Sequence, residues 1–136
     1  MSLLKAMLDT NIASALVKEP HSGPVRDKLF AYGTDRVCIS IVTASELRFG
    51  LEKNPSVKLA TNLDLILNAI DIVPFDAPAD EHYASIRWAL SRTGRVIGPN
   101  DLFIAAHARA LDLVLVTANV REFSRVPGLA VENWLD

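Results

Sequence analysis

Short apolar runs alternate along this chain with segments of helical spacing, and this alternation restricts the fold more than any other feature. The clearest run is Leu113–Thr117, five residues without a charge, which is typical of a strand buried on both faces. Strands that alternate with helices form a mainly parallel sheet, because each helix returns the chain to the same end of the sheet. We therefore predict a three-layer α/β fold in which a central sheet of four to five strands carries helices on both faces.

Polar residues stand where several predicted strands end. Asp9 follows the first strand, Ser40 lies near the end of the second, and Asn119 follows the run at 113–117. Ligands of open parallel sheets bind beyond the carboxyl ends of the strands, so we expect a site at that edge. The expected strands are 3–8, 36–41, 72–75, 113–117 and 129–131, and the expected helices are 12–19, 24–32, 43–53, 59–70, 79–92 and 102–111.

The composition is that of a globular protein, with half of the 136 residues hydrophobic and 22% charged. A chain of this length buries roughly two-thirds of its unfolded surface, so we predict one domain over residues 1–136. The formal net charge of -2 neither indicates nor excludes a nucleic-acid partner, because a near-neutral protein can carry a basic groove. Cys38 is the single cysteine, which excludes an intrachain disulfide framework and a cysteine zinc cluster.

The sequence also bears on the compartment. No apolar run approaches the roughly 18 residues that span a bilayer. The start of the chain lacks a basic leader and meets Asp9 too early for a signal peptide. We therefore expect a cytoplasmic protein that does not associate with a membrane.

The stretch Ile97–Ala108 predicts a buried helix with a polar entrance. Gly98, Pro99 and Asn100 form a loop signal, and Asn100 or Asp101 is expected to cap the helix that follows. The residues after them are apolar on nearly all sides, as in a helix packed against a sheet. On this stretch alone the simpler interpretation of Asp101 is structural, because the dipole and free amides of a helix start favour an ionised carboxylate.

Two further carboxylates are expected near Asp101. Asp9 ends the first strand, and Glu46 lies beside the apolar stripe of its predicted helix rather than opposite it. Taken singly, Asp9 fits a helix cap, Glu46 a solvated helix residue and Asn119 a turn former. Three carboxylates that converge at one edge would repel one another unless a cation neutralises them. A hard divalent ion such as Mg²⁺ or Mn²⁺ is the simplest such cation.

Four motifs surround these residues in a fixed order, namely MLDTN, SIVTASELRFG, GRVIGPNDLFIAAHA and LVTANVREFSRVPGLAVENW. Each alone is weak, but together they resemble the PIN-domain ribonucleases of the VapC toxin type over essentially the whole chain. The resemblance implies a PIN-like fold and a Mg²⁺- or Mn²⁺-dependent endoribonuclease that a small VapB-type antitoxin neutralises. It also implies a homodimer whose two active sites line one groove, and a higher oligomer with the antitoxin.

The identity of the RNA is left more open by the resemblance. The overall likeness is to family members that cut tRNA, including initiator tRNA in its anticodon loop. Ribosomal RNA and messenger RNA are alternatives. The sequence does not assign the dimer interface.

Carried over by position, the resemblance assigns the first three acids of the site to Asp9, Glu46 and Asp101. The fourth acidic position falls at Asn119, which removes a negative charge and weakens the case for a second metal ion, with Glu122 as an alternative acid. Asp9 and Asp101 are then expected to hold the metal, and Glu46 to contact it or its water. The resulting hydroxide would attack phosphorus in line and leave 5′-phosphate and 3′-hydroxyl ends. The groups expected to orient the carboxylates or the water are Thr10, Asn11, Ser40, Thr43 and Thr117.

RNA must be brought to this acidic site, and arginines are the natural phosphate contacts. We favour Arg95, because it lies just before the IGPND loop, followed by Arg87 and Arg92, with Arg48 a lesser candidate. Each of the four is explained equally well as a solvated charge on a helix or loop.

Other conspicuous side chains receive structural interpretations. His107 lies six residues after Asp101 and therefore points away from it on a helix, so we predict a core or interface residue. Ser40 lacks the glycines of a nucleophile elbow, which argues against serine hydrolase chemistry. Trp88 and Trp134 are assigned to packing or a dimer contact rather than to base stacking.

Two other functions fit the same residues. A non-catalytic PIN-like module would bind RNA or a protein partner without cutting, as the missing fourth acid would allow. A metal-dependent nuclease or phosphatase-like enzyme acting on DNA would keep the acids and change the substrate.

Overall fold

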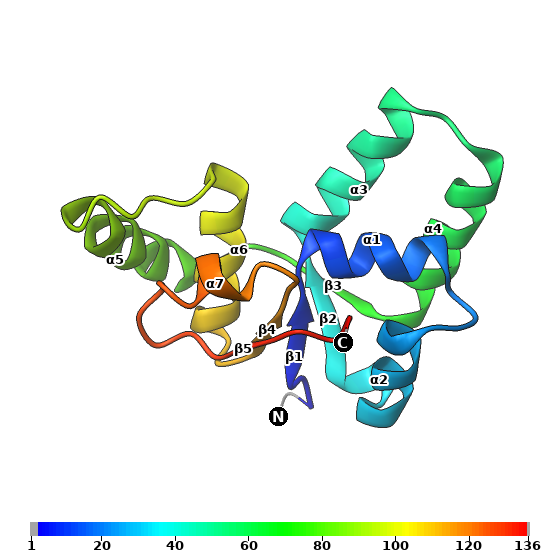
Figure 1. Cartoon of the computed structure of the whole chain (residues 1–136), viewed down its shortest axis with the longest axis horizontal. Helices are drawn as coiled ribbons and strands as arrows, with labels where there is room; N and C mark the ends of the chain where they lie inside the picture. Colours follow the sequence, from blue (N-terminus) through cyan, green and yellow to red (C-terminus); the bar gives the residue numbers. More distant parts are fainter. Residues whose placement is uncertain (1–2, 136) are drawn as a thin grey trace.

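A five-stranded sheet lies at the centre of the computed structural model, which describes residues 3–135 (Figure 1). The strand order is β3-β2-β1-β4-β5, and every pairing is parallel. The predicted α/β fold with a mainly parallel sheet is therefore confirmed. The strands are β1 (Ala6–Leu8), β2 (Val37–Ser40), β3 (Asp71–Val73), β4 (Val114–Val116) and β5 (Val131–Glu132).

Helices cover both faces of the sheet, as predicted (Figure 1). Ala6 and Leu8 of β1 pack in one hydrophobic core with α1, α2 and α4, whereas Met7 packs in a second core with α5 and α6. This division follows from the strand itself, in which successive side chains point to opposite faces. The helices are α1 (Thr10–Lys18), α2 (Pro24–Tyr32), α3 (Ile41–Lys53), α4 (Val57–Ala69), α5 (Ala79–Arg92), α6 (Pro99–Ala110) and α7 (Val120–Phe123), with a 3-10 turn at Thr34–Arg36.

None of the helices in residues 3–135 has the length and apolar character needed to cross a membrane.

The second strand and the helix after it meet without a loop. β2 ends at Ser40 and α3 begins at Ile41, so the predictions of a strand through Ile41 and a helix from Thr43 are wrong at this boundary. The Ser40 side chain causes the early start, because its Oγ accepts a hydrogen bond from the backbone N–H of Val42 at 3.1 Å and caps the helix. The third strand is also displaced from the prediction of 72–75 and ends at Val73, before a proline that has no N–H to donate.

The start of α6 also differs from the prediction. The cap residue is Gly98, Pro99 is the first helical residue, and neither Asn100 nor Asp101 caps the helix. Proline is well suited to the first turn, because its missing N–H would have no partner there. Asn100 and Asp101 therefore lie inside the first turn, with side chains that are free for other contacts. The four-residue helix α7 was not predicted, because one turn is too short to show a period.

The carboxyl end of β1 brings three elements together. Asp9 follows β1 at once and is the cap residue of α1. Its backbone N–H donates to the carbonyl oxygen of Val116 at the end of β4, at 2.8 Å. The ends of β1 and β4 and the start of α1 are thereby fixed at the edge where the site was predicted.

Replacement of Leu115 tests the prediction that the run at 113–117 forms a buried strand. Its side chain is 0% exposed in the second core, so Leu115→Ala should lower the free energy of unfolding by about 2–5 kcal/mol. Leu65→Ala, at a position 46% exposed on α4, is the matched control and should cost about 1 kcal/mol or less. Urea unfolding followed by circular dichroism measures both, and equal midpoints would contradict the assigned core.

Candidate active site

Asp9 is the most deeply held carboxylate of the predicted site, with only 2% of its surface exposed. Its Oδ1 accepts a hydrogen bond from the backbone N–H of Thr10 at 2.8 Å, which is the helix cap. Its Oδ2 accepts hydrogen bonds from Thr117 Oγ1 at 2.7 Å and from Asn11 Nδ2 at 3.3 Å. The structural and the functional interpretations of Asp9 are therefore compatible, because the same contacts that cap α1 also fix the orientation of the carboxylate.

Burial nevertheless dominates the ionisation of Asp9. Loss of hydration raises the pKa of this carboxyl above its ordinary value, and the hydrogen bonds from Thr117 and Thr10 only partly oppose the shift. The negative charges of Glu46 and Glu122 raise the pKa further. Asp9 therefore lies in an environment that favours an additional positive charge.

Glu46 extends from α3 toward the same edge and is held from two sides. Thr10 Oγ1 donates to Glu46 Oε1 at 2.6 Å and also contacts Thr43 Oγ1 at 3.4 Å. Asn100 Nδ2 donates to Glu46 Oε2 at 3.4 Å across 54 positions of sequence. The prediction that Asn100 has only a loop and capping role is therefore wrong, and no sequence period could have revealed a contact between two different helices.

Asp101 is the third residue of α6 and is the most perturbed of the three aspartate and glutamate side chains carried over from the motifs. Partial burial is the largest cause that raises its pKa, to about 6, followed by the charges of Asp9, Glu122 and Glu46. The sequence argument, which rested on the helix dipole, predicted a lowered pKa for Asp101 instead. Burial and three like charges outweigh the dipole at this position.

The side chain of Ser40 contacts the start of α3 and His107. Its Oγ lies 2.8 Å from Nδ1 of His107, and both residues are buried. The prediction that His107 is a core residue is confirmed, and burial lowers the pKa of its imidazole. Trp134 is likewise fully buried, which supports its assignment to packing, whereas Trp88 is exposed.

The fourth acidic position, Asn119, is the cap residue of α7, and its backbone N–H donates to Thr117 Oγ1 at 3.0 Å. This places Asn119 beside the group that holds Asp9. Glu122, in the helix that follows, acts electrostatically on both Asp9 and Asp101. The structure therefore brings Glu122, the alternative acid suggested by the sequence, to this edge.

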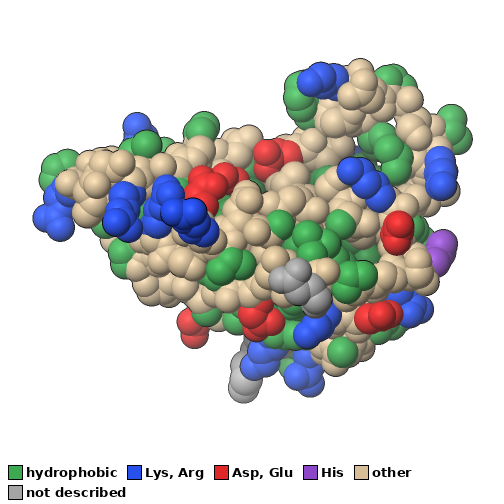
Figure 2. All heavy atoms as spheres, in the orientation of Figure 1, with side chains coloured by type: hydrophobic (Ala, Val, Ile, Leu, Met, Phe, Trp, Pro, Cys, Tyr) green, Lys and Arg blue, Asp and Glu red, His purple; other side chains and the backbone are tan. Residues whose placement is uncertain are grey.

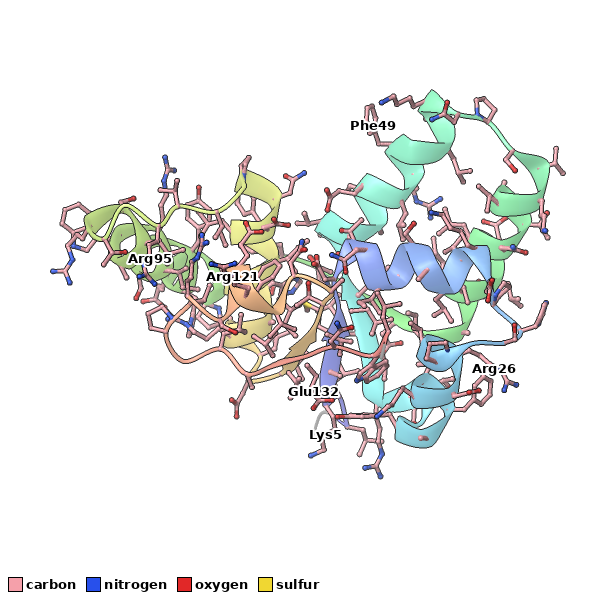
Figure 3. The ribbon with its side chains drawn as sticks, in the orientation of Figure 1. Lys5, Arg26, Phe49, Arg95, Arg121 and Glu132 are labelled. Atoms are coloured by element: carbon pink, nitrogen blue, oxygen red, sulfur yellow. The ribbon has the colours of Figure 1, made fainter. Side chains whose placement is uncertain are left out.

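The arginines predicted to bind RNA differ in their surroundings. Arg87 Nη1 donates to the hydroxyl of Tyr83 on its own helix at 2.9 Å, so this side chain is already engaged. Arg92 and Arg95 are exposed, and neither side chain has a hydrogen bond or ion pair among residues 3–135. Figure 3 shows Arg95 in the segment between α5 and α6.

The side chains at this edge fit a divalent cation in their chemistry. They offer carboxylate oxygens, which Mg²⁺ and Mn²⁺ prefer. Burial first, and then the negative charges of Asp9, Glu122 and Glu46, raise the pKa of Asp101. Within residues 3–135, however, no group of three or more His, Cys, Asp or Glu side chains is placed to hold a metal ion. Mg²⁺ commonly retains several waters and needs only one or two carboxylates, so the donor set suits that ion.

Comparison with known proteins places this site in a family. A model of the PIN domain matches residues 6–129. The tRNA(fMet)-specific endonuclease VapC of Shigella flexneri is 43% identical over 134 residues, which cover 97% of this chain and 99% of that protein. Ribonuclease VapC2 of Haemophilus influenzae is 38% identical over 98% of this chain and 100% of its own length. The chain belongs to the VapC ribonucleases of the PIN-domain family.

Solved structures of VapC relatives share the fold. The chain resembles one in the complex VapBC2 of Rickettsia felis bound to a DNA fragment from its promoter, with a TM-score of 0.88, 34% identity and coverage of 96% of this chain and 99% of that one. The DNA-bound VapBC of Salmonella typhimurium gives a TM-score of 0.85, 37% identity and coverage of 96% and 98%. The predicted PIN-like fold and VapC family are therefore confirmed.

The raised pKa of Asp101 predicts an unusual dependence of stability on pH. A carboxyl whose pKa is higher in the folded chain than in the unfolded chain binds more protons when folded, so stability falls as the pH rises from about 4 to about 6. In the presence of a chelator, Asp101→Asn should therefore melt at a higher temperature than the parent at pH 7. This difference should shrink toward pH 4, where the parent carboxyl is protonated.

The control is Asp64→Asn, which removes the same charge from an exposed position on α4. Calorimetry at both pH values measures the two variants. A melting temperature for Asp101→Asn at or below that of the parent at pH 7 would contradict the electrostatic conflict at this site.

Proposed function

We propose that the chain is a metal-dependent endoribonuclease toxin that hydrolyses RNA phosphodiester bonds and is neutralised by a VapB-type antitoxin. The observation that carries this proposal is that Asp9, Glu46 and Asp101, three carboxylates from different elements, lie close enough at one edge of the sheet for the charge of Glu46 to raise the pKa of both aspartates. A chain has little structural reason to place three like charges together, whereas a metal-dependent nuclease requires them. Membership in the VapC family supports the same function.

Within this proposal, Asp9 and Asp101 hold Mg²⁺ or Mn²⁺, and Glu46 contacts the ion or its water. When bound, the ion supplies the polarisation that makes water nucleophilic at neutral pH and the charge that stabilises the phosphate oxygens. Thr117 and Asn11 keep the Asp9 carboxylate in one orientation through their hydrogen bonds to Oδ2.

The other polar groups have roles that follow from their contacts. Thr10 fixes Glu46 Oε1 with a short bond, while Oε2 has only the 3.4 Å contact from Asn100. Oε2 is therefore the freer oxygen and is the one that would accept a proton from the attacking water. Thr43 supports Thr10, and Asn119 occupies the fourth acidic position as a neutral group beside Thr117.

The proposed substrate is tRNA, because the relative from Shigella flexneri with 43% identity is named a tRNA(fMet)-specific endonuclease. In the proposed reaction water attacks phosphorus and the 3′ oxygen leaves, which gives 5′-phosphate and 3′-hydroxyl ends. We further propose that the chain acts as a single PIN domain in the cytoplasm, as a homodimer and as a higher oligomer with its antitoxin. The family match over residues 6–129 and the VapBC complexes among the structural relatives support these assignments.

Cleavage assays test the catalytic assignment. With Mg²⁺ or Mn²⁺, the parent chain should shorten tRNA, and sequencing of the ends should locate one preferred bond with 5′-phosphate and 3′-hydroxyl termini. Asp9→Asn and Asp101→Asn should abolish detectable cleavage, and Thr117→Val should reduce the rate about 10- to 100-fold, because it removes a group that orients Asp9. Asp64→Asn should cleave like the parent.

Three results would overturn this function or redirect it. Undiminished cleavage by Asp101→Asn, or in excess chelator, would exclude the metal-dependent mechanism. RNA that is retarded on a gel but never shortened would favour a non-catalytic binding module. A parallel assay in which DNA is cut in preference to RNA would change the substrate class.

Metal binding has a separate readout in stability. An ion that binds only the folded chain stabilises it by about 2.7 kcal/mol at 100 times the dissociation constant. Titration with Mn²⁺ at pH 7 should therefore raise the melting temperature of the parent and shift that of Asp101→Asn much less, while Asp64→Asn should follow the parent. Equal shifts in all three proteins would place the ion elsewhere.

A further inference from the structure

The short helix α7 and the turn that follows it present two arginines beside the site. It follows directly after Asn119, and the fully buried side chain of Phe123 anchors it in the core formed with α5 and α6. Arg125 continues the turn, because its backbone N–H donates to the carbonyl oxygen of Glu122 at 3.2 Å. Arg121 and Arg125 are four residues apart, the spacing of neighbours on one side of a helical turn, and both are exposed.

Neither guanidinium group has a hydrogen-bond or ion-pair partner in the part of the chain that the structure describes. In residues 3–135 the single ion pair joins Arg26 Nη1 to Asp27 Oδ1 at 3.7 Å, and neither Arg121 nor Arg125 donates a side-chain hydrogen bond. Arg87 differs, because it is engaged with a tyrosine hydroxyl on its own helix. Arg121 and Arg125 therefore stand on a backbone segment that Phe123 anchors. Their guanidinium N–H groups are available to donate to an incoming anion.

The position of these arginines adjoins the carboxylates. With Ala118, Asn119 and Glu122 they line an open cavity of about 470 Å³. The backbone N–H of Ala118 donates to Asn11 Oδ1 at 3.1 Å, and Asn11 in turn bonds Asp9. Ala118, which lines the cavity, is therefore linked through Asn11 to the hydrogen bonds that hold Asp9.

The figures agree with this placement. Figure 2 shows Lys and Arg side chains gathered next to Asp and Glu side chains on the face that carries α7. In Figure 3, Arg121 and Arg95 project from α7 and from the segment before α6 in the same region of the view. Lys5 lies at the opposite end of β1 in that figure.

We propose that Arg121 and Arg125 form a phosphate-binding site for a phosphodiester of the RNA strand next to the one that is cut. This inference rests on the proposed ribonuclease function and adds the direction in which the strand leaves the carboxylates. Phosphates that approach an acidic site are repelled by it, and two cations beside the acids offset this repulsion at the adjoining nucleotide. Guanidinium groups also match phosphate oxygens with paired hydrogen bonds.

RNA binding at several salt concentrations tests the proposal. The full chain carrying Asp101→Asn, in Mg²⁺, binds a single-stranded RNA without consuming it and serves as the parent. Adding Arg121→Gln and Arg125→Gln should lower the slope of log Kd against log salt concentration by about 0.7 for each arginine and weaken binding to RNAs of different sequence alike. Arg121→Lys with Arg125→Lys should retain most of the slope, because the charge is kept.

The matched control combines Lys5→Gln and Lys28→Gln, which remove the same charge from exposed positions at the other end of β1 and on α2. This pair should leave the slope unchanged, and melting temperatures should show that all variants are folded.

If the arginine pair keeps the slope of the parent, the phosphate-binding site is excluded and the ribonuclease function stands. If that pair binds RNA normally, but the same two changes in the chain with Asp101 intact remove the inhibition of cleavage by a VapB-type antitoxin, the arginines contact protein instead. If the chain with Asp101 intact neither cuts RNA nor binds it, both proposals fail.

Discussion

The buried hydrogen bond between Thr117 and Asp9 is the contact on which the rest of the site depends. It joins Thr117 Oγ1 to Asp9 Oδ2 at 2.7 Å across 108 positions of sequence, and both residues are almost completely buried. The bond fastens the end of β4 to the end of β1, and the other carboxylate oxygen caps α1. A carboxylate placed at this depth is costly unless its oxygens are bonded, so the two strands and the helix must keep their relative positions.

Electrostatic conflict is the consequence of that placement. Asp9 is buried, and Asp101 and Glu46 reach the same edge from two other helices. Burial raises the pKa of both aspartates, and the negative charge of Glu46 raises both pKa values further. The parallel sheet and its two hydrophobic cores must stabilise the chain against this repulsion. Such a conflict is typical of a functional site, where charges are arranged for a ligand rather than for the free protein.

The carboxylates are held by contacts between elements rather than within them. Thr10 of α1 and Asn100 of α6 both donate to Glu46 of α3, so three helices meet at one side chain. A further contact, between Ser40 and His107, connects the cap of α3 with α6. These contacts fix the helices that carry Glu46 and Asp101 relative to each other, which preorganises the site before any ligand arrives.

Sequence alone determined the sheet, the helices that cover it and the edge that carries the acids. Burial on one side imposes a hydrophobic period of two residues on strands and of 3.6 residues on helices, and these periods are visible in the sequence. The motifs around Asp9, Glu46 and Asp101 likewise pointed to the family. Local periodicity does not encode contacts between elements. Only the tertiary structure decided that Ser40 faces His107 and that Asn100 lies inside α6 and reaches Glu46. It also decided that the one-turn helix α7 and the turn after it bring Glu122 and two exposed arginines to the site. Long-range packing selects such partners from many residues with equal local preference, and the raised pKa of Asp101 follows from that packing because burial and like charges overcame the favourable helix dipole.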